Sequence, residues 1–401
     1  MSFEKALTEG KRLIEQGDYG AALESLEKAR NLALIEGAES WAHGESLSWL
    51  GHILVLRGDY AEALEHLEKA LELAGEHKGR NSVETATILR RLGNARAGLE
   101  QFEEGKQNLE EALSIFKDVL GPYNTEVADT LCDLGTCLVT SQDLDRAGDC
   151  LTKAYGMRRK LLGDEHPDLI RSLSDLSVFY SVSGNNASAR AFSRKAVSLG
   201  DSILPEDHPL LGIACFNLTN QYLKDRRFEA GKPSGQRART ILEKKLGDLH
   251  ELRIMTLEFL GTIAMSMSES DEAEELLKQA LVMSQAKWGR EDPHILPSLI
   301  ALGTAYLKSN DYKNAELYLK MSLAVLQHAR DFDVSLEYRL IDQLSISYFW
   351  QGKIGDAALL VPSAYRAKHT SDFTMLMDAL HKLAGFVSKQ LEKDQTGAGR
   401  H

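Results

Sequence analysis

Small and apolar residues recur along this chain at a fixed spacing. A Leu followed by a small residue returns every 42 residues, and the small member is Gly51, Gly93, Gly135, Ser177, Thr219, Gly261, Gly303 or Ser345. Twelve residues after each comes a second small residue, Ala63 in the first case, and seven further on a third, Ala70. One more copy precedes these with Gly10, Ala22 and Ala29. The spacing predicts nine copies of one structural unit.

Within one copy, two stripes of helical spacing flank a polar break at residues 57–60. The stripes are made by Leu47, Leu50, Gly51 and Leu54 on one side and by Ala63, Leu67 and Ala70 on the other. Positions i, i+3, i+4 and i+7 share one helix face, so each copy is predicted to be an antiparallel helix pair. The small residues mark the places where the two helix axes come close, since larger side chains would overpack that contact by about 1–3 kcal/mol.

Such pairs cannot bury both faces alone, so they must stack on their neighbours. The predicted fold is all-α, an α-solenoid of nine hairpins over residues 1–370 that form one domain. A further helix at 371–392, with Leu380, Leu383, Ala384 and Val387 in stripe spacing, is expected to cap the last hairpin. Residues 393–401 are expected to be a disordered tail.

Aromatic residues and linker motifs carry a family resemblance. Tyr180, Tyr222, Tyr306 and Tyr348 stand three residues after the small column, and the linkers read LGDEHPD at 162–168, LPEDHP at 204–209 and WGREDPH at 288–294. The chain resembles tetratricopeptide repeat (TPR) proteins, and its 42-residue period is similar to the kinesin light chain type. The resemblance, over roughly residues 5–370, implies a right-handed superhelix whose concave groove usually holds peptides.

Two departures argue against the motor-adaptor role of that family. No heptad coiled coil stands before the first repeat, and the family's paired Asn is matched only by Asn217 and, less closely, Asn94 and Asn220.

The face of each first helix opposite its apolar stripe is the predicted groove. Its candidate partner-binding residues are Trp49, His52, Arg90, Arg91, Asn94, Asp133, Thr136, Asp175, Asn217, Asn220, Phe259 and Trp350. Arg and Asn can grip a peptide backbone or carboxylate, and the apolar later part suits an amphipathic helix. The alternative is that Arg91 only pairs with Asp133 and that the chain's own C-terminus covers the apolar part.

Residues 224–245 form a basic segment that also carries helix breakers. Its candidate partner-binding residues are Arg226, Arg227, Lys232, Arg237 and Arg239. Either they meet an acidic partner, or they form surface salt bridges with the acidic residues at 269–275, each worth under about 1 kcal/mol. Unless Pro233 falls in the first turn, the second helix here is predicted to be kinked, shortened or to start late, and the segment would then be a hinge.

Charge and cysteine content narrow the function classes. The net charge of −12 argues against nucleic-acid binding, and no apolar run is long enough to span a membrane. The charged N-terminus lacks a signal core, and the four cysteines read as buried thiols, so a cytoplasmic location is expected. His166, His208 and His250 follow the repeat and are interpreted as linker residues, so no metal site is expected.

No catalytic residue, cofactor site or enzyme motif stands out in the sequence. The predicted function is therefore a non-enzymatic scaffold or adaptor that binds a peptide or helix of another protein in the groove. The alternative is a regulatory TPR receptor that a ligand or peptide switches.

Overall fold

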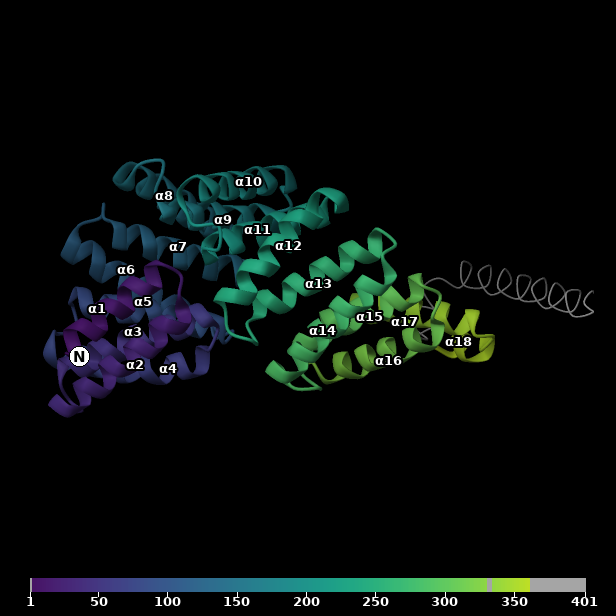
Figure 1. The fold of residues 1–401 in the computed structure, drawn as a ribbon, viewed down its shortest axis with the longest axis horizontal. Helices are drawn as coiled ribbons and strands as arrows, with labels where there is room; N and C mark the ends of the chain where they lie inside the picture. Colours follow the sequence, from purple (N-terminus) through teal and green to yellow (C-terminus); the bar gives the residue numbers. More distant parts are fainter. Residues whose placement is uncertain (1, 330–333, 361–401) are drawn as a thin grey trace, which may run out of the picture. The chain divides into compact units, whose positions relative to one another are not determined.

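A computed structural model describes residues 2–329 and 334–360, and the described chain is built from helices in consecutive antiparallel pairs (Figure 1). The first helices of the pairs are α1 (Phe3–Glu15), α3 (Trp41–Arg57), α5 (Val83–Gly98), α7 (Thr125–Thr140), α9 (Pro167–Val182), α11 (Pro209–Lys224), α13 (Glu251–Ser266), α15 (Leu296–Lys308) and α17 (Val334–Trp350). The second helices are α2 (Tyr19–Glu36), α4 (Tyr60–His77), α6 (Phe102–Leu120), α8 (Leu144–Leu162), α10 (Asn186–Ile203), α12 (Phe228–Lys245), α14 (Ser270–Trp288), α16 (Tyr312–His328) and α18 (Ile354–Leu360). A short 3₁₀ helix, η1 (Pro293–Ile295), precedes α15. The predicted α-solenoid of hairpins is confirmed.

The chain divides into two compact units, residues 1–283 and residues from 284 onward. The first unit contains α1 to α13, and the second contains α15 to α18. The predicted capping helix at 371–392 and tail at 393–401 lie outside the described residues. They remain predictions, as does a single domain over 1–370.

Every hairpin turn holds one residue in the left-handed backbone region. These residues are Gly17, Gly58, Glu100, Gln142, Gly184, Arg226, Ser268, Asn310 and Gly352, with φ between 56° and 79°. Glycine adopts this conformation without cost, whereas the other residue types are strained by roughly 1 kcal/mol or more. The turn therefore keeps its geometry even where its residue is not glycine.

The small column and the second helix are complementary in size. A Cβ added at Gly135 would lie 2.6 Å from Leu151 Cγ, and Gly93 meets Leu109 in the same way. Where the column holds Ser177, the facing residue is Ser193, and the two hydroxyls hydrogen-bond at 2.5 Å. Where it holds Thr219, the facing residue is Gly235, whose added Cβ would lie 3.1 Å from Thr219 Cγ2.

The linker histidines begin helices. His166, His208 and His250 are the N-cap residues of α9, α11 and α13, and each Nδ1 accepts the backbone N–H two residues later, at 3.1–3.3 Å. Pro167 and Pro209 follow at the first helical position, where a missing N–H costs nothing. Their interpretation as linker residues is confirmed.

Helix α12 corrects one prediction. It starts at Phe228, 42 residues after the start of α10, and runs for 18 residues with Pro233 inside it. The prediction that Pro233 shortens the helix or delays its start is wrong. Gly231 and Gly235 on the same helix lie tightly against Tyr222 and Leu260, so these glycines serve packing.

No helix in the described ranges is long and apolar enough to cross a membrane.

Candidate functional site

The first helices of the first unit carry the predicted groove residues on one side, which we call the inner face. It is made by the residues at 42-residue intervals on α3, α5, α7, α9, α11 and α13: Trp49, Arg91, Asp133, Asp175, Asn217 and Phe259. Neighbouring first helices pack on one another, so these side chains meet those of the next repeat.

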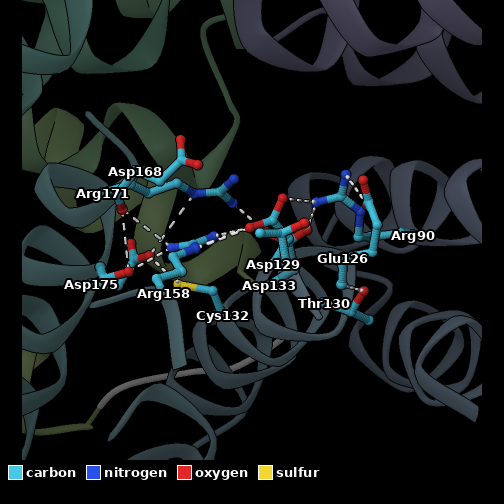
Figure 2. Close-up of polar contacts among 12 residues, drawn as sticks. Arg90, Glu126, Asp129, Thr130, Cys132, Asp133, Arg158, Asp168, Arg171 and Asp175 are labelled. Carbon is cyan, nitrogen blue, oxygen red and sulfur yellow. Dashed lines mark hydrogen bonds and ion pairs between the residues drawn. The ribbon is translucent and has the colours of Figure 1, made fainter. Parts of the chain in front are cut away.

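Asp133 on α7 is the centre of a polar network that joins three repeats (Figure 2). It is 2 % exposed, and its carboxylate accepts a 2.9 Å hydrogen bond from Asn94 on α5 and pairs with Arg171 on α9. Arg90 lies 3.5 Å from the same carboxylate. The predicted alternative, an Arg91–Asp133 pair, is therefore wrong, because Arg90, Asn94 and Arg171 hold Asp133.

A second carboxylate extends this network toward the second helices. Arg158 on α8 is 1 % exposed and reaches Asp129 at 2.7 and 3.0 Å, while its other nitrogen donates to Ser172 at 2.5 Å (Figure 2). Burial would raise the pKa of Asp129, but Arg158 and Arg90 outweigh it and hold that pKa below its usual range. Arginines of α5 and α8 thus keep Asp129 ionised, while arginines of α5 and α9 pair with Asp133.

Sequence reasoning missed Asp129, Arg158 and Arg171. Arg158 had a usable signal, because the same position in other repeats is filled by buried Ala74, Phe116, Leu242 and Leu326. A charged residue in an apolar column indicates a buried ion pair.

Cys132 and Asp175 form the far edge of this network. The Cys132 thiol donates to Asp175 at 2.9 Å. Burial raises the pKa of Asp175, and burial followed by the Asp175 charge raises the pKa of Cys132. The thiol is therefore protonated and a poor nucleophile.

Arg91 on α5 differs from the arginines of this network, which are paired with carboxylates. It is 6 % exposed, its guanidinium lies 4.2 Å from the Trp49 ring centre, and it donates to Ser48 at 2.6 Å. Among the described residues it has no carboxylate ion pair, and its Nε is buried without an acceptor. Burial, followed by repulsion from Arg90, lowers its pKa to about 9.

Burial followed by Arg91, Arg90 and Arg171 also lowers the pKa of His52 well below its usual value. This imidazole is neutral near pH 7. Arg91 therefore remains an inner-face cation that has no ion-pair partner among the described residues.

The remaining predicted groove residues differ in their surroundings. Asn217 is buried, Asn220 is half-buried, and Thr136 is exposed. Phe259 stacks on Phe216 with ring centres 5.0 Å apart. Trp350 lies in the second unit, exposed and stacked on Tyr312, so it is described apart from the others.

The basic segment is largely paired within the chain. Lys232 reaches Glu269 at 2.5 Å and Glu272 at 2.8 Å, as the salt-bridge alternative predicts. Arg237 pairs with Asp201 at 2.6 Å and Arg239 with Glu243 at 2.7 Å.

The two turn arginines of this segment are exposed. Arg226 is the left-handed turn residue, and the Arg227 guanidinium lies 5.5 Å from the Tyr222 ring centre.

The sequence matches a family model described as tetratricopeptide repeat. Five matches cover residues 10–76, 43–118, 84–160, 126–202 and 255–328, which is well over half of the chain. No curated protein matches the sequence significantly.

Solved structures of similar fold include TPR proteins of several kinds. A Rap protein complexed with competence and sporulation factor is 12% identical, covers 85% of this chain and 99% of its own, and has a TM-score of 0.53. NprR in complex with its cognate peptide NprX is 14% identical, with coverages of 88% and 97% and a TM-score of 0.55. The TPR-like repeats of a putative kinesin light chain from Podosopora anserina are 22% identical, with coverages of 52% and 99% and a TM-score of 0.44.

Proposed function

Because the chain belongs to the tetratricopeptide repeat family, we propose that it is a non-enzymatic scaffold that holds a peptide or helix of a partner protein on its inner face. The observation that carries this proposal is Arg91, a buried cation that has Trp49 and Ser48 beside it and no carboxylate partner among the described residues.

The charge of Arg91 favours a ligand with an anionic group. Leaving a buried charge without a partner is costly, whereas an arginine can hold a carboxylate by two parallel hydrogen bonds. The neighbouring carboxylates Asp129 and Asp133 are already held by Arg158, Arg171 and Arg90. A peptide carboxylate, at a side chain or a C-terminus, would thus complete the interactions of the Arg91 guanidinium.

Two further observations support this proposal. Two proteins of similar fold were solved in complexes, a Rap protein with competence and sporulation factor and NprR with its cognate peptide NprX. Three of the four thiols are buried and all are free, which fits the reducing cytoplasm that we propose as its location.

A switched receptor is the second candidate, and the burial of the inner face favours it. Asn217 is 7 % and Arg91 6 % exposed, so a ligand that reaches both must displace side chains or helices. Small-angle scattering of the full chain with and without bound peptide separates the two. A scaffold keeps the same radius of gyration, whereas a switch changes it.

Affinity capture with two matched variants tests the scaffold proposal. Arg91→Met removes the inner-face cation, and Arg146→Met removes an exposed cation of α8 that pairs with Glu110. Partners recovered by the unchanged chain are identified by mass spectrometry, and their fragments are titrated by calorimetry. We expect Arg91→Met to weaken binding about tenfold or more, the loss typical of a charge-assisted hydrogen bond, and Arg146→Met to leave it unchanged. Equal affinities of the two folded variants would refute the role of Arg91.

A further inference from the structure

The two ends of the first unit meet one another. One apolar cluster contains Ala6 and Leu26 of the first hairpin together with Leu211, Phe216 and Ile241 of α11 and α12. Every described member of this cluster, partly buried residues included, comes from α1–α3 or from residues 197–259. Since the intervening helices do not bridge the two groups, the first two hairpins pack directly against the later ones.

The contact, which we call the seam, centres on the turn of the first hairpin. His208 Nε2 lies 3.2 Å from the Glu15 carbonyl oxygen, across 193 residues of sequence. Gly17 lies against Pro209, so closely that an added Cβ would overlap the proline ring. The Arg57 guanidinium lies beside Gly247, where an added Cβ would be 3.5 Å from its Nη2.

The seam is weaker than the stacking of consecutive hairpins. No backbone connection joins its two sides, and the hydrogen bond between His208 and the Glu15 carbonyl contributes on the order of 1 kcal/mol. Consecutive hairpins, in contrast, are covalently joined and pack over whole helices. Opening of the first unit would therefore begin at the seam.

Trp49 connects the seam to Arg91, because it packs against the seam cluster and its ring centre lies 4.2 Å from the Arg91 guanidinium. Arg91 itself is only 6 % exposed. A partner that is to contact Arg91 must first gain access to this interior.

We propose that the seam between the first hairpin and the start of α11 is a gate, and that its opening admits a partner to the inner face. The proposal rests on the proposed function of that face, because a gate matters only if something binds behind it. The Gly17–Pro209 contact and the His208–Glu15 hydrogen bond hold the gate closed.

The repeat supplies matched variants for both contacts. Gly17 and Gly184 occupy the same left-handed turn position, but an added Cβ at Gly184 meets nothing within 4 Å. Gly17→Ala therefore disturbs the seam, whereas Gly184→Ala carries only the backbone strain that both share. His208→Asn keeps a capping side chain for α11 and removes the reach to Glu15, and His166→Asn is the same change at the start of α9.

The probe is phenylglyoxal, which modifies guanidinium groups, and it requires no partner. The rate of modification of Arg91 in the full chain is followed by mass spectrometry of its proteolytic fragment, and circular dichroism establishes that each variant is folded. We expect His208→Asn to raise this rate about fivefold over His166→Asn, the factor that one lost hydrogen bond gives. Gly17→Ala, which adds an overlap with Pro209, should also raise it over Gly184→Ala.

Equal rates within each pair of folded variants overturn the gate. If Gly17→Ala does not fold, the histidine pair decides alone. Loss of partner capture in Arg91→Met with equal modification rates would leave the binding function standing without a gate. Raised rates without any Arg91-dependent capture would leave a gate without that function.

Discussion

At the scale of single residues, the notable feature of this chain is a set of buried charged side chains between its helices. Arg158, Asp129, Arg171 and Asp133 connect α7, α8 and α9 through charge-assisted hydrogen bonds (Figure 2). Such pairs are costly to break, because removing one member leaves the other buried and uncompensated.

We predict that Arg158→Met lowers the free energy of unfolding by about 3 kcal/mol or more, since Asp129 loses its closest partner. Denaturant unfolding followed by circular dichroism measures this change. Arg146→Met, on the exposed face of the same helix, is expected to cost less than about 1 kcal/mol. Adding Asp129→Leu to Arg158→Met should restore part of the loss, and a double variant weaker than the single would contradict this account.

Glu316 gives a pH prediction for the second unit. Burial would raise its pKa, but hydrogen bonds from Lys320, Lys353 and Gln351 outweigh it and lower the pKa to about 2. A carboxylate whose folded pKa is below its unfolded value of about 4.3 stabilises the fold above that value, and this contribution is lost as the pH falls toward 2. We expect Glu316→Gln to reduce stability at pH 7 and to flatten the loss between pH 4.5 and 2. Parallel stability–pH curves for the two proteins would rule out this role.

At the scale of helices, the hairpin contact depends on one small residue facing one large one. Gly135 faces Leu151, whereas Ser177 faces Ser193 and Thr219 faces Gly235. The exchange of sizes between the two helices explains how the column accommodates Ser177 and Thr219.

We predict that Gly135→Ala destabilises the chain by about 1–3 kcal/mol through overpacking against Leu151. Gly156→Ala on α8 adds a methyl in open space and should stabilise the helix by about 0.5–1 kcal/mol. Thermal unfolding of both variants gives the comparison. Two shifts of the same sign would show that the glycine column has no packing role.

The helix positions and their pairing into hairpins could be predicted from the sequence, because the same spacing of small and apolar residues recurs nine times. The second helices from α4 to α18 start at 42-residue intervals, as the repeat predicts, and His166, predicted to be a linker residue, caps α9. The apolar column marks Arg158 as a buried charge, but its partner could not be predicted, because Arg158 is on a second helix and reaches Asp129 across 29 residues. The cost of Pro233 does not shorten α12, because the packing of this helix against its neighbours outweighs the cost of one proline.

At the scale of the whole molecule, we propose that partners bind to the first helices and not to the second ones. The seam, the polar network around Asp133 and the side chain of Arg91 all lie in the first unit. The second unit carries its own exposed aromatic residue, Trp350, which the account leaves without a role in that binding.

Site-specific photocrosslinking tests this claim most directly. A benzophenone amino acid is placed at Thr136, the exposed predicted groove position of α7, or at Lys153 on the exposed face of α8, and the full chain is irradiated with its captured partner. The account predicts a crosslink from position 136 and none from position 153. A crosslink from position 153 with none from position 136 would contradict it.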